Sequence, residues 1–224
     1  FSFQNYSLIG IGDKGKFIGL NNYFDVIASS DIFNALKNTL VFNIGSTFLT
    51  FLLAFALALL INNNEPFGSG YIRALILIPW AIPVVAVSMV FLWIFNPEYG
   101  IINFVFKDLG LITDYKRWVT DPSLAMFTII ITSVWVRFPF MWIMLYTGLQ
   151  NIPKSLYEAA KIDGANGSQQ FIFITLPSIK SIIGVVTLVT IIWNFQMFTL
   201  IWIMTKGGPI ETTTTFSIKL YKTA

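Results

Sequence analysis

The side chains that most often carry covalent chemistry are missing from this sequence. It contains neither cysteine nor histidine, which removes disulfides, thiolate nucleophiles, imidazole bases and the commonest zinc ligands at once. The acidic residues all lie outside the long apolar stretches described below, so no nucleophile in those stretches is paired with a carboxylate base. We therefore expect no catalytic residue, no metal site and no cofactor in this chain.

One charged residue, Arg137, lies near the middle of a long apolar stretch, two residues before Pro139. A charge at that depth in a membrane is costly, and such residues face the interior of a helix bundle or a water-filled passage. Two interpretations remain open. The guanidinium either binds helix carbonyls that Pro139 frees, or it contacts a solute in a translocation pathway.

A second group of polar and aromatic residues has helical spacing. Thr190, Trp193, Asn194 and Met197 follow at i, i+3, i+4 and i+7, which places them on about one face of a helix. An aromatic ring stacks on the C–H faces of a sugar, and an amide hydrogen-bonds its hydroxyls in a dry site. The group is either a wall of a sugar pocket or plain packing, with Trp193 between helices.

These residues belong to four apolar stretches, 39–61, 74–95, 124–149 and 182–204, each long enough to cross a bilayer. Apolar residues make up 55% of the chain and charged residues 11%, with a mean hydropathy of +0.71, whereas a soluble domain has roughly 25% charged residues. The runs are continuously apolar, unlike the alternating strands of membrane barrels. The expected fold class is an all-α polytopic membrane protein. The basic residues are scattered singly, which excludes a nucleic-acid surface.

Segment 150–178 connects two of these stretches and contains signals for two short helices. Asp163 and Gly164 end the first helix in a turn, and Ser168 is placed to cap a second helix that ends before Pro177. The segment is either a docking element for another protein or an interfacial loop that packs on its own bundle.

The order of residues in this segment resembles a known family. The matching positions are Glu158-Ala159-Ala160, Gly164, Ile174 and Leu176-Pro177. They are similar to the cytoplasmic loop signature of ABC import permeases, and the longer run through Ile162-Asp163-Gly164-Ala165 resembles the carbohydrate branch. The run Gly207-Gly208-Pro209 is similar to the larger subunit of the maltose permease type.

The resemblance implies a type I importer permease core with six transmembrane helices in the full chain, four of them complete here. Residues 1–224 would form a single transmembrane permease domain, truncated at both ends, in the bacterial cytoplasmic (inner) membrane. Segment 150–178 would be a cytoplasmic coupling loop. The coupling residues implied are Glu158, Ala159, Ala160, Asp163 and Gly164.

The resemblance also implies the partners of this chain. They are a second homologous permease subunit, two cytoplasmic ATPase subunits that would hydrolyse the ATP, and an extracytoplasmic solute-binding protein. The distribution of lysine and arginine favours the opposite orientation, but the basic residues on the other face are spread over long segments mixed with acids. The loop signature therefore decides the orientation.

The solute is implied by the same resemblance. In the maltose type the corresponding helix lines the sugar pocket beside the matching proline, which implies that Arg137 and Phe140 line it here. Thr190, Trp193, Asn194 and Met197 would form a second wall. The maltose type has a small residue where Arg137 stands, and this departure favours an acidic sugar or a phosphorylated polyol over a neutral disaccharide.

Two other classes of protein compete with an importer subunit. A fragment of a secondary transporter driven by an ion gradient would need intramembrane carboxylates, and the four apolar stretches contain none. An intramembrane enzyme would need a paired nucleophile and base, which these stretches also lack.

Overall fold

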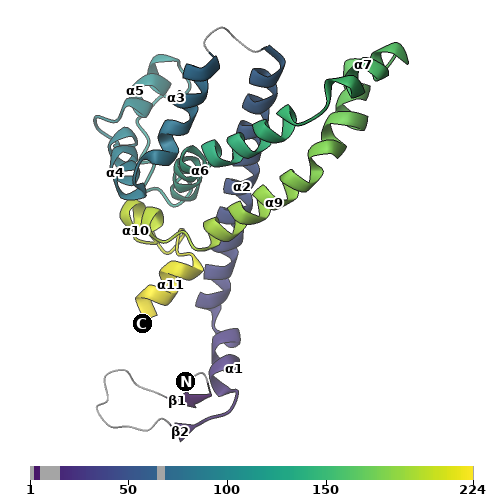
Figure 1. Ribbon diagram of the computed structural model, residues 1–224. Coiled ribbons are helices and arrows are strands. Elements are labelled where there is room, and N and C mark those ends of the chain that lie inside the picture. The colour runs from purple at the N-terminus through teal and green to yellow at the C-terminus, as the bar shows by residue number, and fades with distance from the viewer. Residues whose placement is uncertain (1–2, 6–15, 65–68, 224) are drawn as a thin grey trace.

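The computed structural model describes residues 3–5, 16–64 and 69–223. These parts of the chain are almost entirely helical, and three of their helices are long and apolar enough to cross a membrane (Figure 1). A short antiparallel pair, β1 (Gln4–Asn5) with β2 (Lys16–Phe17), precedes helix α1 (Asn21–Ala28). The all-α membrane architecture expected from the sequence is confirmed.

Two long helices form the centre of the bundle. Helix α2 (Ser30–Asn64) includes the whole first expected span, and α6 (Ala125–Gln150) includes nearly all of the third. They pack along each other, and the fully buried Ala54 and Ala58 lie in the C-terminal half of α2. Small residues let the two backbones approach closely, which is how helices associate in lipid.

The second expected span, 74–95, is wrong as a single helix. The chain forms α3 (Ser69–Ala81) and α4 (Val84–Ile94) instead, and the two are bent by 96° at the break. Pro83 has an extended conformation (φ −56°, ψ 134°), and it has no N–H with which to continue the hydrogen bonds of α3. Both halves pack against α6.

The sequence indicated that the second short helix of segment 150–178 ends before Pro177, but in the structure the helix continues. Helix α8 (Gly167–Gln170) continues through a π-helical turn, η1 (Phe171–Thr175), into α9 (Leu176–Phe195). The N–H of Leu176 donates to the Phe171 carbonyl, five residues back. This wider turn accommodates Pro177, whose ring would clash with a carbonyl four residues back in a regular α-helix.

The cap of α8 also differs from expectation. Asn166, in an extended conformation, replaces Ser168 as the N-cap. Its side chain accepts a hydrogen bond from the Gln169 N–H at 2.9 Å, and the Gln169 side chain accepts one from the Asn166 N–H at 2.8 Å. This reciprocal capping box satisfies two N–H groups that a single serine cap would not.

The fourth expected span, 182–204, is wrong at both ends. Helix α9 begins earlier and stops at Phe195, and after a break α10 (Thr199–Thr205) packs against α4. Residues 196–198 contain neither proline nor glycine. The fully buried Leu200 and Ile201 belong to the same apolar cluster as Val87 of α4, so tertiary packing holds α10 in its new direction. Helix α11 (Phe216–Thr223) then packs on α2.

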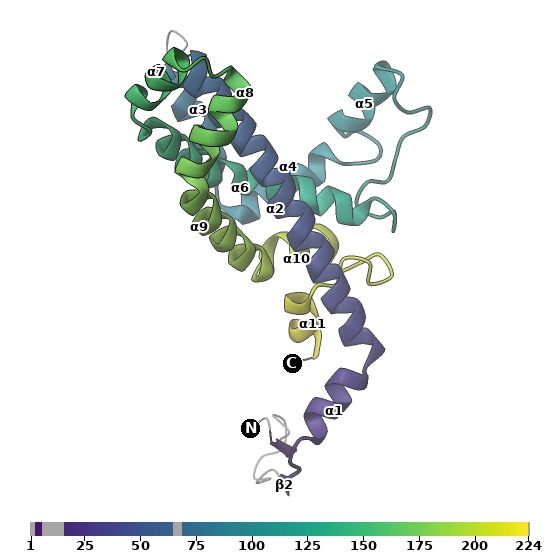
Figure 2. The ribbon, with the colours of Figure 1, turned by 90° about the vertical axis from the view of Figure 1, so that its right-hand side faces the viewer.

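The connecting segments lie at two opposite ends of the bundle. In Figure 2, α7 (Lys154–Ile162) and α8 lie where α2 finishes, whereas α5 (Ile101–Asp108) and the loop between α10 and α11 lie on the opposite side. The two sets of segments therefore occupy different faces, as alternation of the spans requires. We call them the coupling end and the outer end.

One buried amide organises the outer end. Asn103 on α5 is 0% exposed, and its Nδ2 donates to the carbonyls of Pro97 and Lys116 at 3.1 and 3.0 Å. Its Oδ1 accepts hydrogen bonds from the Lys116 N–H at 3.1 Å and from Trp118 Nε1 at 2.8 Å. Because this amide uses its full bonding capacity, it fixes the path of the loop that follows α5.

We predict that Gly100→Ala destabilises the outer end. A Cβ at this position would overlap the backbone carbonyl oxygens of Asn96 and Ile94, which have no freedom to rotate aside. The expected loss is about 1–3 kcal/mol, measured as a lower thermal unfolding midpoint of the purified protein in detergent. Gly70→Ala, whose Cβ would meet no atom within 4 Å, is the matched control. Equal midpoints for the two variants would contradict the prediction.

Candidate solute pathway and coupling loop

A layer of polar side chains divides the hydrophobic interior of the bundle. An apolar cluster that includes Phe42 lies toward the outer end, and a second cluster that includes Trp142 lies toward the coupling end. Polar residues at mid-bundle depth are costly in a membrane and either join helices or line a pathway. The buried polar residues of this layer are Asn43, Ser46, Thr47 and Thr50 on α2, Ser133 on α6, and Thr190 and Asn194 on α9.

Part of this layer is a hydrogen-bond chain that ties α9 to α2 and α6. Asn194 Nδ2 donates to the Thr47 hydroxyl at 3.1 Å, and the Ser133 hydroxyl lies 3.5 Å from Asn194 Oδ1. Thr47 in turn donates to Asn43 Oδ1 at 3.2 Å, and Asn43 Nδ2 donates to the Ile191 carbonyl at 2.9 Å. The side chains of Asn194, Thr47 and Asn43 therefore bind within the bundle, whereas the buried hydroxyls of Ser46 and Thr50 have no hydrogen-bond partner among the described residues.

Arg137 of α6 lies beside a small cavity, next to the side of α9 that carries Trp193 and not the side that carries Asn194. Its guanidinium carbon is 5.0 Å from the centre of the Trp193 ring, and that ring is 4.7 Å from the ring of Phe140. Nε of Arg137 is buried, and within the described residues it has no hydrogen-bond partner. The alternative in which Arg137 binds carbonyls freed by Pro139 therefore has no hydrogen bond to support it in this part of the chain.

Both helix breaks meet at this cavity, which has a volume of about 230 Å³. Val84, the first residue of α4, lines it together with Gln196, Phe198 and Thr199 from the break between α9 and α10. The first N–H groups of α4 have no partners within their own helix, and a helix N-terminus carries a partial positive charge. Among the described residues, no carboxylate lines the cavity. A guanidinium, a positive helix end and an aromatic ring suit an anion that carries a sugar-like C–H face.

The structure separates the six expected pathway residues into two groups. Arg137, Trp193 and Met197 line the cavity, and Phe140 packs on Trp193. Thr190 and Asn194 are buried away from it: the Thr190 hydroxyl donates to the Val186 carbonyl at 2.8 Å, and Asn194 binds Thr47. The cavity residues that the sequence did not indicate are Val84, Gln196, Phe198 and Thr199.

The expected coupling residues lie in and beside a compact turn at the coupling end. Helix α7 ends in a Schellman motif, in which the Gly164 N–H donates to the Lys161 carbonyl at 3.1 Å and the Ala165 N–H to the Ala160 carbonyl at 2.8 Å. Gly164 has φ +77°, a left-handed conformation that an L side chain rarely adopts. The expected turn at Asp163 and Gly164 is present.

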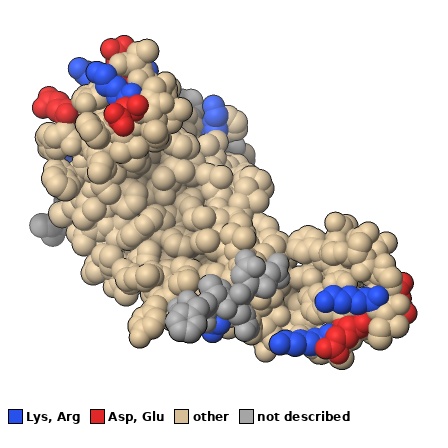
Figure 3. Space-filling view, turned by 90° about the horizontal axis from the view of Figure 1, so that it is seen from above, with Lys and Arg blue, Asp and Glu red and all other residues tan. Residues whose placement is uncertain are grey.

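Helix α7 offers an unusually free surface. None of its residues is buried, and Glu158 and Ala159 are exposed. Within the described ranges Glu158 has no ion-pair partner. The helix is fastened at its base by the buried Ile152 and by a hydrogen bond of 2.8 Å between the hydroxyls of Tyr157 and Thr175. In Figure 3 charged side chains gather over α7 and over the α5 region, with an uncharged body between them.

Comparison with known proteins decides the family. The family described as binding-protein-dependent transport system inner membrane components matches residues 50–224. The chain belongs to this family. The match includes Arg137 and all of segment 150–178. The chain is therefore a permease of an ATP-binding-cassette importer and not a fragment of an ion-gradient transporter.

Two relatives show the breadth of the family. The permease is 36% identical over 202 residues to the trehalose/maltose transport system permease protein MalF of Thermococcus litoralis, covering 90% of this chain and 68% of that protein. It is also 36% identical over 226 residues to the sulfoquinovosyl glycerol transport system permease protein SmoG of Agrobacterium fabrum, covering 99% and 70%. Both relatives are transport permeases.

The fold matches a solved importer. The crystal structure of a bacterial ABC transporter involved in the import of the acidic polysaccharide alginate aligns with a TM-score of 0.77 and 27% identity, covering 93% of the permease and 73% of that chain. A second structure of the alginate transporter is a complex with an alginate pentasaccharide-bound periplasmic protein, again with a TM-score of 0.77. The type I importer fold expected from the sequence is confirmed.

We predict that Gly164→Ala loosens the coupling loop. An added Cβ meets no atom within 4 Å, so the whole effect comes from the left-handed backbone, at about 1–2 kcal/mol. Hydrogen exchange of residues 154–165 should become faster than in the wild-type permease. At Gly167 an added Cβ also meets no atom within 4 Å, and the backbone φ is not positive. Gly167→Ala should therefore leave hydrogen exchange of residues 154–165 unchanged. Identical exchange in the two variants would argue against a strained turn.

Proposed function

We propose that the permease carries an anionic sugar or sugar derivative inward across the cytoplasmic membrane. The supporting observation is the Arg137 guanidinium, which stands beside Trp193 in a cavity that no carboxylate lines. An arginine there attracts a carboxylate, sulfonate or phosphate and binds it through forked hydrogen bonds. Trp193 and Phe140 offer aromatic faces to the sugar ring.

The solutes named for the relatives are compatible with this class. Sulfoquinovosyl glycerol and alginate are anionic sugars, and trehalose and maltose are neutral. The permease therefore has relatives of both kinds, and Arg137 is the residue of this chain that favours the anionic kind. In this proposal Asn194 and Thr190 are positioning residues, which hold α9 so that Trp193 faces the cavity.

The proposal includes the assembly that drives transport. Residues 1–224 form one membrane domain whose segment 150–178 lies in the cytoplasm. The permease pairs with a second homologous permease and with two ATPase subunits, which hydrolyse ATP. An extracytoplasmic binding protein delivers the solute to the outer end. Glu158, Ala159, Ala160, Asp163 and Gly164 form the surface that contacts one ATPase, and the exposed, unpaired Glu158 suits a basic residue of that subunit.

Arg137→Met should reduce uptake of an anionic solute far more than uptake of a neutral one. A charged hydrogen bond contributes about 1.5–3 kcal/mol, which is roughly 10- to 100-fold in rate. The measurement is competitive uptake by the full importer in proteoliposomes, with a uronate oligosaccharide, sulfoquinovosyl glycerol and maltose as solutes. Arg137→Lys, which keeps the charge and loses the fork, should be intermediate. An equal reduction for all solutes, or none, would overturn the assignment.

Glu158→Lys should uncouple the ATPase without affecting membrane insertion. The substitution places a like charge opposite the expected basic partner, at a position where no ion pair within the described residues is lost. ATP hydrolysis by the reconstituted importer should then respond at least tenfold less to the loaded binding protein. Glu158→Asp keeps the charge at the same position and serves as control, with a response close to that of the wild type. Full stimulation of the Glu158 variant would refute the docking assignment.

A further inference from the structure

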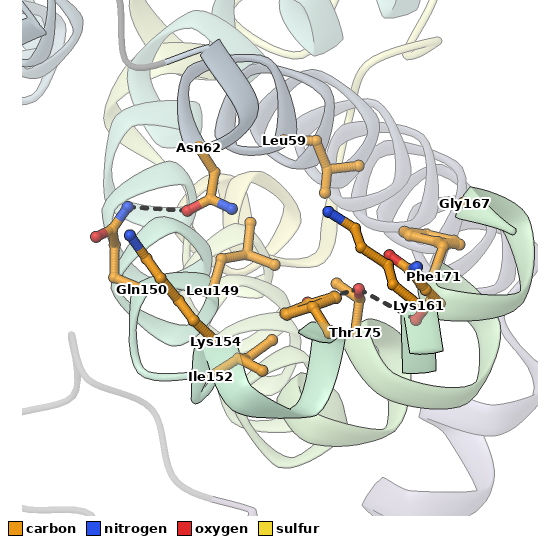
Figure 4. Close-up of a pocket in the computed structure, with 12 residues that line it drawn as sticks. Leu59, Asn62, Leu149, Gln150, Ile152, Lys154, Lys161, Gly167, Phe171 and Thr175 are labelled. Carbon is orange, nitrogen blue, oxygen red and sulfur yellow. Dashed lines mark hydrogen bonds between the residues drawn. The ribbon is translucent and has the colours of Figure 1, made fainter. Parts of the chain in front are cut away.

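A second, larger cavity lies at the coupling end, behind α7. It has a volume of about 640 Å³, and its walls come from the ends of α2 and α6, from α7, and from α8 and η1. Figure 4 shows Lys161 reaching across it toward Leu59, while Lys154 points toward Gln150. This cavity has no lining residue in common with the one beside Arg137.

The cavity is cationic. Lys154, Tyr157 and Lys161 stand at i, i+3 and i+7, so one face of α7 directs two ammonium groups into the cavity. No carboxylate is among its lining residues, and neither lysine has an ion-pair partner in the described ranges. The facing wall offers the amides of Asn62 and Gln150, which share a hydrogen bond of 2.8 Å. Ammonium and amide groups around one space are ligands for an anion.

The surroundings of the cavity identify the class of anion. Phe171 lines it, and the next residues of the π turn, Ile172 and Phe173, are apolar and exposed. The cavity therefore lies at the boundary where a polar end of the bundle meets an apolar flank. A phosphate group placed between the lysines would leave attached acyl chains free to lie along that flank, and basic pockets on the cytoplasmic side of a membrane bind lipid headgroups in this way.

We propose that this cavity binds a phosphate group between Lys154 and Lys161, and that the bound anion holds α7 against the bundle. No residue of α7 is buried, and within the described residues a single side-chain hydrogen bond, between the hydroxyls of Tyr157 and Thr175, fastens it. An anion that also reaches Asn62 and Gln150 adds a bridge from α7 to the ends of α2 and α6. The opposite face of α7, with Ala159 and the 87% exposed Ile162, remains free for an ATPase subunit.

The test uses the full importer complex reconstituted in three settings. These are phosphatidylcholine vesicles, the same vesicles with added inorganic phosphate, and vesicles with increasing amounts of phosphatidylglycerol. The readout is hydrogen exchange of residues 154–165. Protection should increase with phosphatidylglycerol if the source is a lipid, and with inorganic phosphate if the source is soluble. Either response supports the cavity, provided that it depends on the two lysines.

That dependence is measured with matched variants. The double substitution Lys154→Gln and Lys161→Gln should raise the half-saturating amount of the anion by about 30-fold, the effect of removing two lysines from an anionic lipid surface. Lys180→Gln with Lys222→Gln removes the same charge from exposed lysines that do not line the cavity, and it should respond as wild type. Lys154→Arg with Lys161→Arg should restore the response. Equal behaviour of the two glutamine variants, or no response to either anion, would overturn the proposal.

Discussion

A backbone N–H or C=O group inside a bilayer has no water to bind, so a membrane helix breaks only where protein or a water-filled space receives the freed groups. Two spans of this permease break, at Pro83 and at residues 196–198, and α4 and α10 beyond the breaks pack against each other. Arg137 and Trp193 stand where the breaks meet. The position of the cavity, the polar layer across the bundle and the separation of its two apolar clusters all follow from this constraint.

One continuous helix connects the coupling loop to that cavity. From Gly167 the chain runs through the π turn to Phe195, 29 residues without a break, or about 44 Å. Tyr157 ties α7 to this helix near its start, at Thr175, and Trp193 lies near its end. In the proposed coupling, this helix is the connection between α7 and the wall of the cavity, and the Asn194–Thr47 hydrogen bond links the same helix to α2.

The sequence was informative wherever a local rule decides the structure. Long apolar runs specified α2 and α6, and a glycine after Asp163 specified the left-handed turn. Pro83 lies within the expected span 74–95. Membrane helices often contain proline, because neighbouring helices bind the backbone groups that it frees, so the sequence did not predict the 96° bend. The break after Phe195 has no local signal at all, because burial of Leu200 and Ile201 produces it. Helical spacing placed Asn194 and Trp193 on about one face of a helix. In the structure the Asn194 amide binds Thr47 of α2, whereas the Trp193 ring lines the cavity.

The central claim is that the cavity beside Arg137, where the two breaks meet, is a cationic and water-accessible part of the proposed solute pathway, and the absence of cysteine from the chain makes this directly measurable. Gln196→Cys places a single thiol on the cavity wall. In the assembled importer it should react with membrane-impermeant methanethiosulfonates, faster with an anionic reagent than with a cationic one. Leu188→Cys, on a 59% exposed apolar face of α9, should stay unreactive in lipid. An unreactive thiol at position 196, or equal rates with both reagents, would contradict the account.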